Sequence, residues 1–164
     1  LSIYLSIYLS IYLSIYLSWL QCLADNDLGV PLPPPIVLNE GDAATREGWE
    51  RLIVPPGLRE RVLRVERTAD AARVEYTVVN PSWLTCYPAH SHHGAVAFAA
   101  SGGGNGDAST TTLTWTVAVR PCRGGAPLVR LLTSTIVPAF TRNLAARLGD
   151  AEAAEVSFSW ANSS

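Results

Sequence analysis

The chain has 164 residues, a length typical of a single domain. With 48% hydrophobic and 16% charged residues, it can bury a substantial core. Its formal charge of −2 gives no electrostatic case for a nucleic-acid partner, which would require a clustered basic face.

The first segment is a low-complexity repeat. Residues 1–18 repeat Leu-Ser-Ile-Tyr four times and then add Leu-Ser, a period far shorter than the roughly 20–50 residues of structural repeats. The base unit CTAT, read in frame, encodes the same residues, which favours a translated microsatellite. Two alternatives stay open, a membrane or targeting segment of about twenty residues and an alternating β-strand. A membrane partner is expected only if residues 1–24 exist in the mature protein.

The next segment is a linker, and six candidate strands follow it. Pro33, Pro34 and Pro35 remove backbone donors, so residues 19–35 are predicted to be an extended, Pro-rich linker. Residues 101–109 are Gly-rich and predict a loop between the last two strands. Short apolar or alternating patterns predict strands over residues 36–39, 46–54, 58–66, 73–80, 94–100 and 110–120.

The apolar period then changes to that of a helix. One long amphipathic helix is predicted over residues 128–148, and Gly149 is a typical residue to end it. Pro138 predicts a kink near residues 134–138, because it removes a hydrogen bond and clashes with the carbonyl four residues back. Residues 150–164 are a tail. Successive strands followed by one helix predict an α+β fold, an antiparallel sheet with a helix laid across it.

The order of these elements resembles a known family. TTLTWTVAVRP at residues 111–121 and LVRLLTSTIVPAFTRNLAARL at residues 128–148 are similar to the second half of START-like (SRPBCC) proteins of the polyketide cyclase/dehydrase type. The resemblance covers residues 36–149 and implies a helix-grip fold, a curved antiparallel sheet packed on a long C-terminal helix. The family's first strand and lid helices are missing from the pattern, so we expect an N-terminally incomplete gene model.

The resemblance and the strand alternation together suggest residues that line a pocket between sheet and helix. Ordinary core packing is the alternative for each of them. Glu60 and Arg61 point to opposite faces, so only one of the two can face the cavity. The candidate ligand-binding residues are Trp49, Arg61, Tyr76, Phe98, Leu113, Trp115, Val117, Ile136 and Phe140.

Cysteine and histidine residues are the remaining candidates for chemistry. Cys86, His90, His92 and His93 fit no standard zinc spacing, so we interpret them as a polar loop at the pocket mouth and predict no metal and no cofactor. The cysteines form no disulfide framework, which favours a reducing, cytoplasmic compartment.

The predicted function is binding of a small hydrophobic molecule, with no identified catalytic residue. One alternative is an enzyme of the cyclase/dehydratase type, which needs an ionisable group in the cavity, with Arg61 or His93 as the candidates. The other alternative is a fragment without function.

Overall fold

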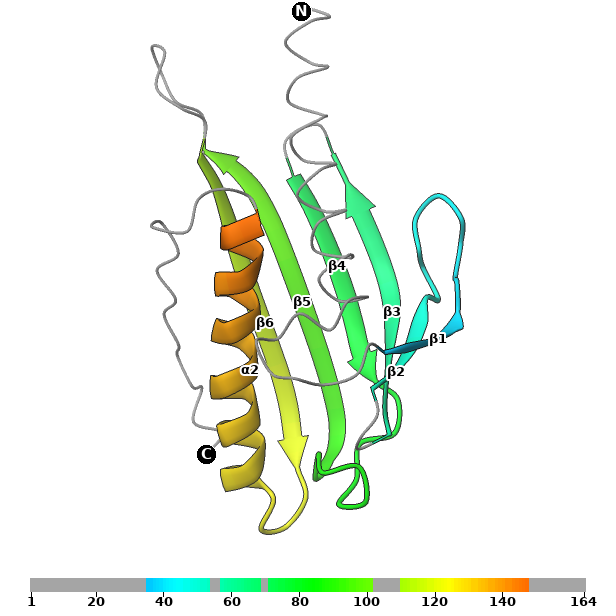
Figure 1. Ribbon diagram of the computed structural model, residues 1–164, viewed down its shortest axis with the longest axis vertical. Helices are drawn as coiled ribbons and strands as arrows, with labels where there is room; N and C mark the ends of the chain where they lie inside the picture. The colour runs from blue at the N-terminus through cyan, green and yellow to red at the C-terminus, as the bar shows by residue number, and fades with distance from the viewer. Residues whose placement is uncertain (1–34, 54–56, 69–70, 102–109, 148–164) are drawn as a thin grey trace, which may run out of the picture.

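The computed structural model describes residues 35–53, 57–68, 71–101 and 110–147 (Figure 1). The Leu-Ser-Ile-Tyr repeat, residues 19–34 of the linker, most of the predicted loop at 101–109 and the tail at 150–164 lie outside the described residues. Within the described part, no helix is long and apolar enough to span a bilayer.

Within the described residues, six strands form one antiparallel sheet in which each strand pairs with the next along the chain. Figure 1 shows that the long strands curve and that the helix lies across one face. All six predicted strands are present, and the predicted α+β class is confirmed. The strands are β1 (Ile36–Asn39), β2 (Glu50–Ile53), β3 (Leu58–Arg67), β4 (Ala71–Val78), β5 (Ala89–Ser101) and β6 (Thr110–Pro121).

The second strand is shorter than the predicted residues 46–54. Before it the chain turns, because the Asp42 carboxylate accepts hydrogen bonds from the backbone N–H groups of Ala44 and Thr45. Arg46 then adopts a positive φ of 64°, a conformation incompatible with a strand. The local turn chemistry therefore delays the strand to Glu50.

The fifth strand begins earlier than predicted, at Ala89 instead of Gly94. His90, His92 and His93 therefore lie on a strand, and their interpretation as a polar loop was wrong. The physical reason is pairing with β6, which continues to Pro121 opposite Ala89 and satisfies the backbone of the histidine segment. The turn lies before it, where the hydroxyl groups of Ser82 and Thr85 bond to each other's backbone N–H.

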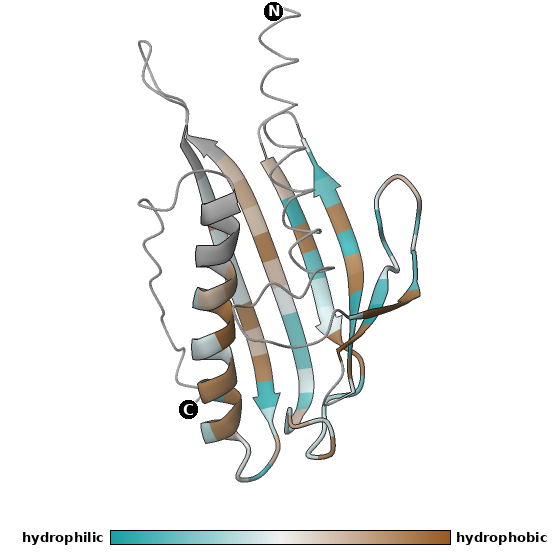
Figure 2. Ribbon diagram, in the orientation of Figure 1, coloured by the Kyte–Doolittle hydropathy of each residue, from teal (hydrophilic) through white to brown (hydrophobic). Residues whose placement is uncertain are grey.

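The C-terminal element is the helix α2 (Ala126–Arg147), which runs continuously through Pro138 (Figure 1). The kink predicted near residues 134–138 does not interrupt it. In that stretch the hydroxyl groups of Ser134 and Thr135 both donate to the carbonyl oxygen of Leu131. Figure 2 shows the hydrophobic residues of the described part of α2 along the side next to β5 and β6.

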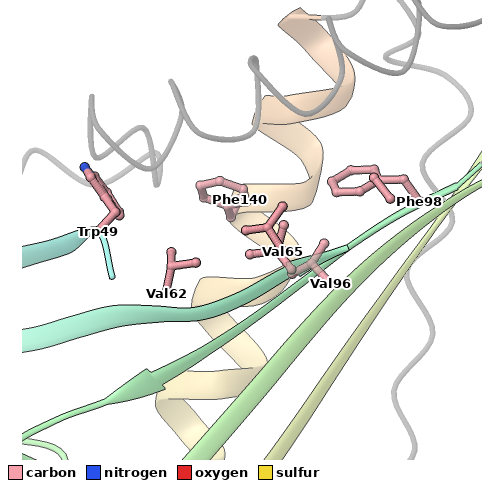
Figure 3. Close-up of a cluster of buried hydrophobic side chains, with 8 residues drawn as sticks. Trp49, Val62, Val65, Val96, Phe98 and Phe140 are labelled. Carbon is pink, nitrogen blue, oxygen red and sulfur yellow. The ribbon is translucent and has the colours of Figure 1, made fainter. Parts of the chain in front are cut away.

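Two hydrophobic clusters join α2 to the sheet at different heights. The Phe140 cluster, drawn in Figure 3, consists of Trp49, Val62, Val65, Ala72, Val74, Val96, Phe98 and Phe140. Tyr76, Leu113 and Trp115 pack against it. The Val129 cluster consists of Val78, Tyr87, Ala89 and Val129, with Leu58, Val119 and Leu132 packed against it. Because Val129 and Phe140 are three turns apart on the helix, the sheet and α2 are pinned together at two points.

Candidate ligand pocket

A cavity of about 430 Å³ lies between the sheet and α2. Five strands, the turn before β5 and the helix contribute to its wall. The residues that line it are Trp49, Arg51, Ile53, Leu58, Glu60, Arg61, Val62, Tyr76, Val78, Thr85, Cys86, Tyr87, His92, Trp115, Val117, Leu132, Thr133, Ile136 and Val137.

The position of the cavity follows from the two clusters. Val129 and Phe140 are 2% and 1% exposed, whereas Ile136, on the helix between them, is 37% exposed. The curved sheet therefore meets the helix near both cluster contacts and leaves room beside the middle of α2. A volume of this size falls within the roughly 300–1,000 Å³ that is usual for small-molecule sites.

Six of the nine predicted ligand-binding residues border the cavity: Trp49, Arg61, Tyr76, Trp115, Val117 and Ile136. The other three, Phe98, Leu113 and Phe140, belong to the Phe140 cluster. Phe140 packs edge-on against Trp115, which does line the cavity, with ring centroids 5.3 Å apart.

Arg61 borders the cavity, but its charged group lies on the other face of the sheet. The register places Arg61 opposite Glu50, and Nη2 of Arg61 lies 2.7 Å from Oε2 of Glu50. Arg59 binds the other oxygen of the same carboxylate. Burial raises the pKa of Glu50, but its hydrogen bonds and ion pairs with Arg61 and Arg59 outweigh burial and hold the pKa below the usual value.

Glu60, not Arg61, presents its charge on the cavity face, where it pairs with Arg51. Nε and Nη2 of Arg51 lie 2.7 and 2.5 Å from Oε2 of Glu60. The side chains are 4% and 19% exposed, and the Arg51 guanidinium lies 5.9 Å from the centroid of the Trp49 ring. Alternation correctly placed Glu60 and Arg61 on opposite faces but did not show which face is concave.

His92 is a further polar side chain in the wall. Its Nδ1 accepts a hydrogen bond of 3.3 Å from the backbone N–H of Val78. Its ring lies between those of Tyr76 and Tyr87, at centroid distances of 5.3 and 5.7 Å. Burial lowers the pKa of His92 to about 4, although the charge of Glu60 opposes the shift, so the ring is neutral at physiological pH.

The phenol groups of Tyr76 and Tyr87 add to the polar part of the wall. The indole N–H of Trp115 donates a 2.8 Å hydrogen bond to the oxygen of Tyr76. Burial, followed by the charge of Glu60, raises the pKa of both Tyr76 and Tyr87, so both phenols keep their protons. The sequence analysis identified Tyr76 but missed Tyr87, which lies in the turn that was treated as a polar loop.

The remaining cysteine and histidine residues do not converge on the cavity as a ligand set. His93 points to the outer face, where its Nε2 lies 3.8 Å from the carboxylate of Glu75. Among the described residues, no three His, Cys, Asp or Glu side chains form a group that would hold a metal ion. The thiols of Cys86 and Cys122 are free.

Comparison with known proteins gives little more. No family model matches the chain, and no curated protein matches it. A similar solved structure is the solution NMR structure of a structural-genomics target from Thermobifida fusca, which is 20% identical and gives a TM-score of 0.48. The similarity covers 82% of this chain and 87% of the other.

Proposed function

We propose that this chain binds a small hydrophobic molecule in the cavity between the sheet and α2. The observation that carries the proposal is a cavity of about 430 Å³ whose wall is mostly aliphatic and aromatic, with a few polar groups at one part of it. Burial of apolar surface supplies the binding free energy in such sites, at about 25 cal/mol per Å², and the polar groups orient the ligand.

We also propose that the chain is a START-like (SRPBCC) protein of the polyketide cyclase/dehydrase type with a helix-grip fold. The support is the order of elements, a curved antiparallel meander of six strands followed by a helix that lies across its face. The threonine-rich strand β6, followed by a Pro/Gly turn and α2, also supports the proposal. The cytoplasm remains our proposal for the compartment, on the cysteine argument above.

The test is a titration of the full chain with Nile red, an uncharged apolar dye whose fluorescence rises in apolar surroundings. Val117→Trp places an indole in the cavity and should weaken dye binding at least tenfold. Thr116→Trp is the matched control, because Thr116 is the neighbouring residue on the exposed face of β6. Circular dichroism checks that both variants fold. The proposal is contradicted if both variants bind the dye as tightly as each other. It is also contradicted if the wild-type protein does not bind the dye.

A cyclase/dehydratase-type activity is the second candidate, favoured by the location of Glu60 and His92 in the cavity wall. The groups first considered for this role, Arg61 and His93, direct their polar groups to the outer face. In a β-hydroxy ketone, Glu60 would take the proton next to the carbonyl and return it to the departing hydroxyl, which leaves as water, while His92 donates a hydrogen bond to the carbonyl oxygen.

The activity is tested with 4-hydroxy-4-phenylbutan-2-one, whose dehydration yields a conjugated ketone that absorbs in the near ultraviolet. Turnover that falls at least a hundredfold in Glu60→Gln supports an enzyme. Absence of turnover by a wild-type protein that binds the substrate leaves binding alone as the function.

A further inference from the structure

We infer that the ligand is an uncharged molecule with an apolar body and a hydroxyl group, and that Glu60 and His92 bind this hydroxyl. The inference rests on the proposed function, since it names the class of molecule that the same cavity takes. The observation behind it is that some hydrogen-bonding groups of the cavity wall have no partner among the described residues.

The first of these groups is an oxygen of Glu60. Both nitrogen atoms of Arg51 that contact this carboxylate bind Oε2. Within the described part of the chain, Oε1 has no hydrogen-bond donor. The Glu60 side chain is only 19% exposed, and a carboxylate oxygen largely withdrawn from water is costly without a donor. The wall therefore presents a strong acceptor.

The second group is a nitrogen of His92. Because Nδ1 accepts the Val78 N–H, the proton of the neutral ring is assigned to Nε2. The residue is 9% exposed, and among the described residues no acceptor is hydrogen-bonded to Nε2. Tyr76 adds a similar donor, since its oxygen already accepts from Trp115 while its own O–H has no acceptor within the same described set. The wall therefore also presents donors.

These groups lie in one region of the cavity. The rings of His92 and Tyr76 are 5.3 Å apart, and both side chains line the cavity together with Glu60. The charge of Glu60 acts on His92 and on Tyr76 alike. A hydroxyl matches such a region, because a single oxygen accepts from one neighbour and donates its hydrogen to another.

The charges of the wall determine the charge of the ligand. Arg51 and Glu60 form a pair whose formal charges cancel, and His92 and both phenols are neutral. The charge of Arg61 is directed to the other face of the sheet, where it pairs with Glu50. A carboxylate or an ammonium group would lose its hydration in the cavity without an unmatched opposite charge to compensate. A neutral hydroxyl loses less hydration and regains its hydrogen bonds.

The test compares three probes of nearly the same size, 2-naphthol, naphthalene and 2-naphthoate, by titration calorimetry with the full chain at pH 7. We expect 2-naphthol to bind at least tenfold more tightly than either of the other two. Equal binding of 2-naphthol and naphthalene overturns the inference but leaves the proposed function standing. If 2-naphthoate binds most tightly of the three, the inference is likewise overturned and the proposed function still stands. If none of the three binds, both the inference and the proposed function fail.

Variants then assign the preference to the named residues. His92→Phe should reduce the preference for 2-naphthol over naphthalene to less than threefold while leaving naphthalene affinity within threefold of wild type. Tyr87→Phe is the matched control, because Tyr87 lines the same cavity but its hydroxyl is hydrogen-bonded to Thr133. If His92→Phe destabilises the chain, Glu60→Gln provides the same readout at the acceptor. An unchanged preference in a folded variant of either residue contradicts the assignment.

Discussion

The indole nitrogen of Trp115 on β6 hydrogen-bonds the phenol oxygen of Tyr76 on β4 at 2.8 Å, across the intervening strand β5. The β5 residue that pairs with Tyr76 is Gly94. A Cβ atom at this position would overlap the Tyr76 ring. Gly94 thus lets the tyrosine lie over the backbone of β5, reach Trp115 and form the cavity wall.

Gly94→Ala should lower the free energy of unfolding by about 1–3 kcal/mol, because the added methyl group displaces the Tyr76 ring and strains a packed region. Urea denaturation followed by tryptophan fluorescence measures the change. In a Tyr76→Ala background the same substitution should cost clearly less, since the ring it displaces is gone. An equal cost in both backgrounds would show that overlap with Tyr76 is not the cause.

The buried pair of Arg51 and Glu60 should be far more sensitive to loss of one partner than to loss of both. Arg51→Met leaves a largely buried carboxylate without its cation and should cost about 3–5 kcal/mol of stability. The double variant Arg51→Met with Glu60→Leu should recover most of that loss. Chemical denaturation of the single and double variants measures both values.

The control for this prediction is an exposed ion pair on β3, the strand that also holds Glu60. Arg64 and Glu66 are 2.7 Å apart, with side chains 65% and 48% exposed. Arg64→Met should change stability by less than about 1 kcal/mol, because solvent screens the pair. Similar losses at Arg51 and Arg64 would mean that burial of the Arg51 pair is not what makes it matter.

His92 should make the fold sensitive to acid. Its pKa is lowered from 6.5 to about 4 by burial, so between these values the unfolded chain binds more protons than the folded chain. The contribution to stability is full above pH 6.5 and is lost as the pH falls toward 4, by roughly 3 kcal/mol in total at about 1.36 kcal/mol per pKa unit. Denaturation midpoints measured from pH 7.5 to 4.5 report this slope.

The matched pair of variants for the pH profile is His92→Gln and His93→Gln. Glutamine at 92 removes the titration, so the slope between pH 6.5 and 4.5 should flatten. His93 lies on the outer face with a side chain 49% exposed, so its replacement should leave the slope nearly unchanged. The other ionisable groups that act on the His92 ring are Glu60 and His93, and a slope insensitive to His92→Gln would assign the acid sensitivity to other groups.

Phe140 and Ile136 should separate core packing from pocket lining on the same helix. Phe140 is 1% exposed within a closed cluster, so Phe140→Ala should cost about 3–5 kcal/mol. Ile136 is 37% exposed and borders the cavity, so Ile136→Ala should cost about 1 kcal/mol or less while changing Nile red affinity. A larger loss at Ile136 than at Phe140 would place the core at the middle of α2.

The sequence by itself determined the elements and which residues share a face. A period of two over Leu113, Trp115 and Val117, and the change to a helical period after Gly125, depend only on local geometry, and both features appear in the structure. The sequence likewise placed Glu60 and Arg61 on opposite faces. It did not predict that β5 starts at Ala89, because pairing with β6 supplies that part of the ladder.

Only the tertiary structure decided which of these faces encloses the cavity and which polar groups meet there. Arg51 and Glu60 are brought together by the register between β2 and β3, and His92 joins them from β5 through the pairing of four strands. Side chains alternate between the two faces of a strand every two residues, whatever the curvature of the sheet. The alternation therefore looks the same whether a face is concave or convex. Curvature and the two contacts of α2 distinguish them, and both are properties of the packed chain.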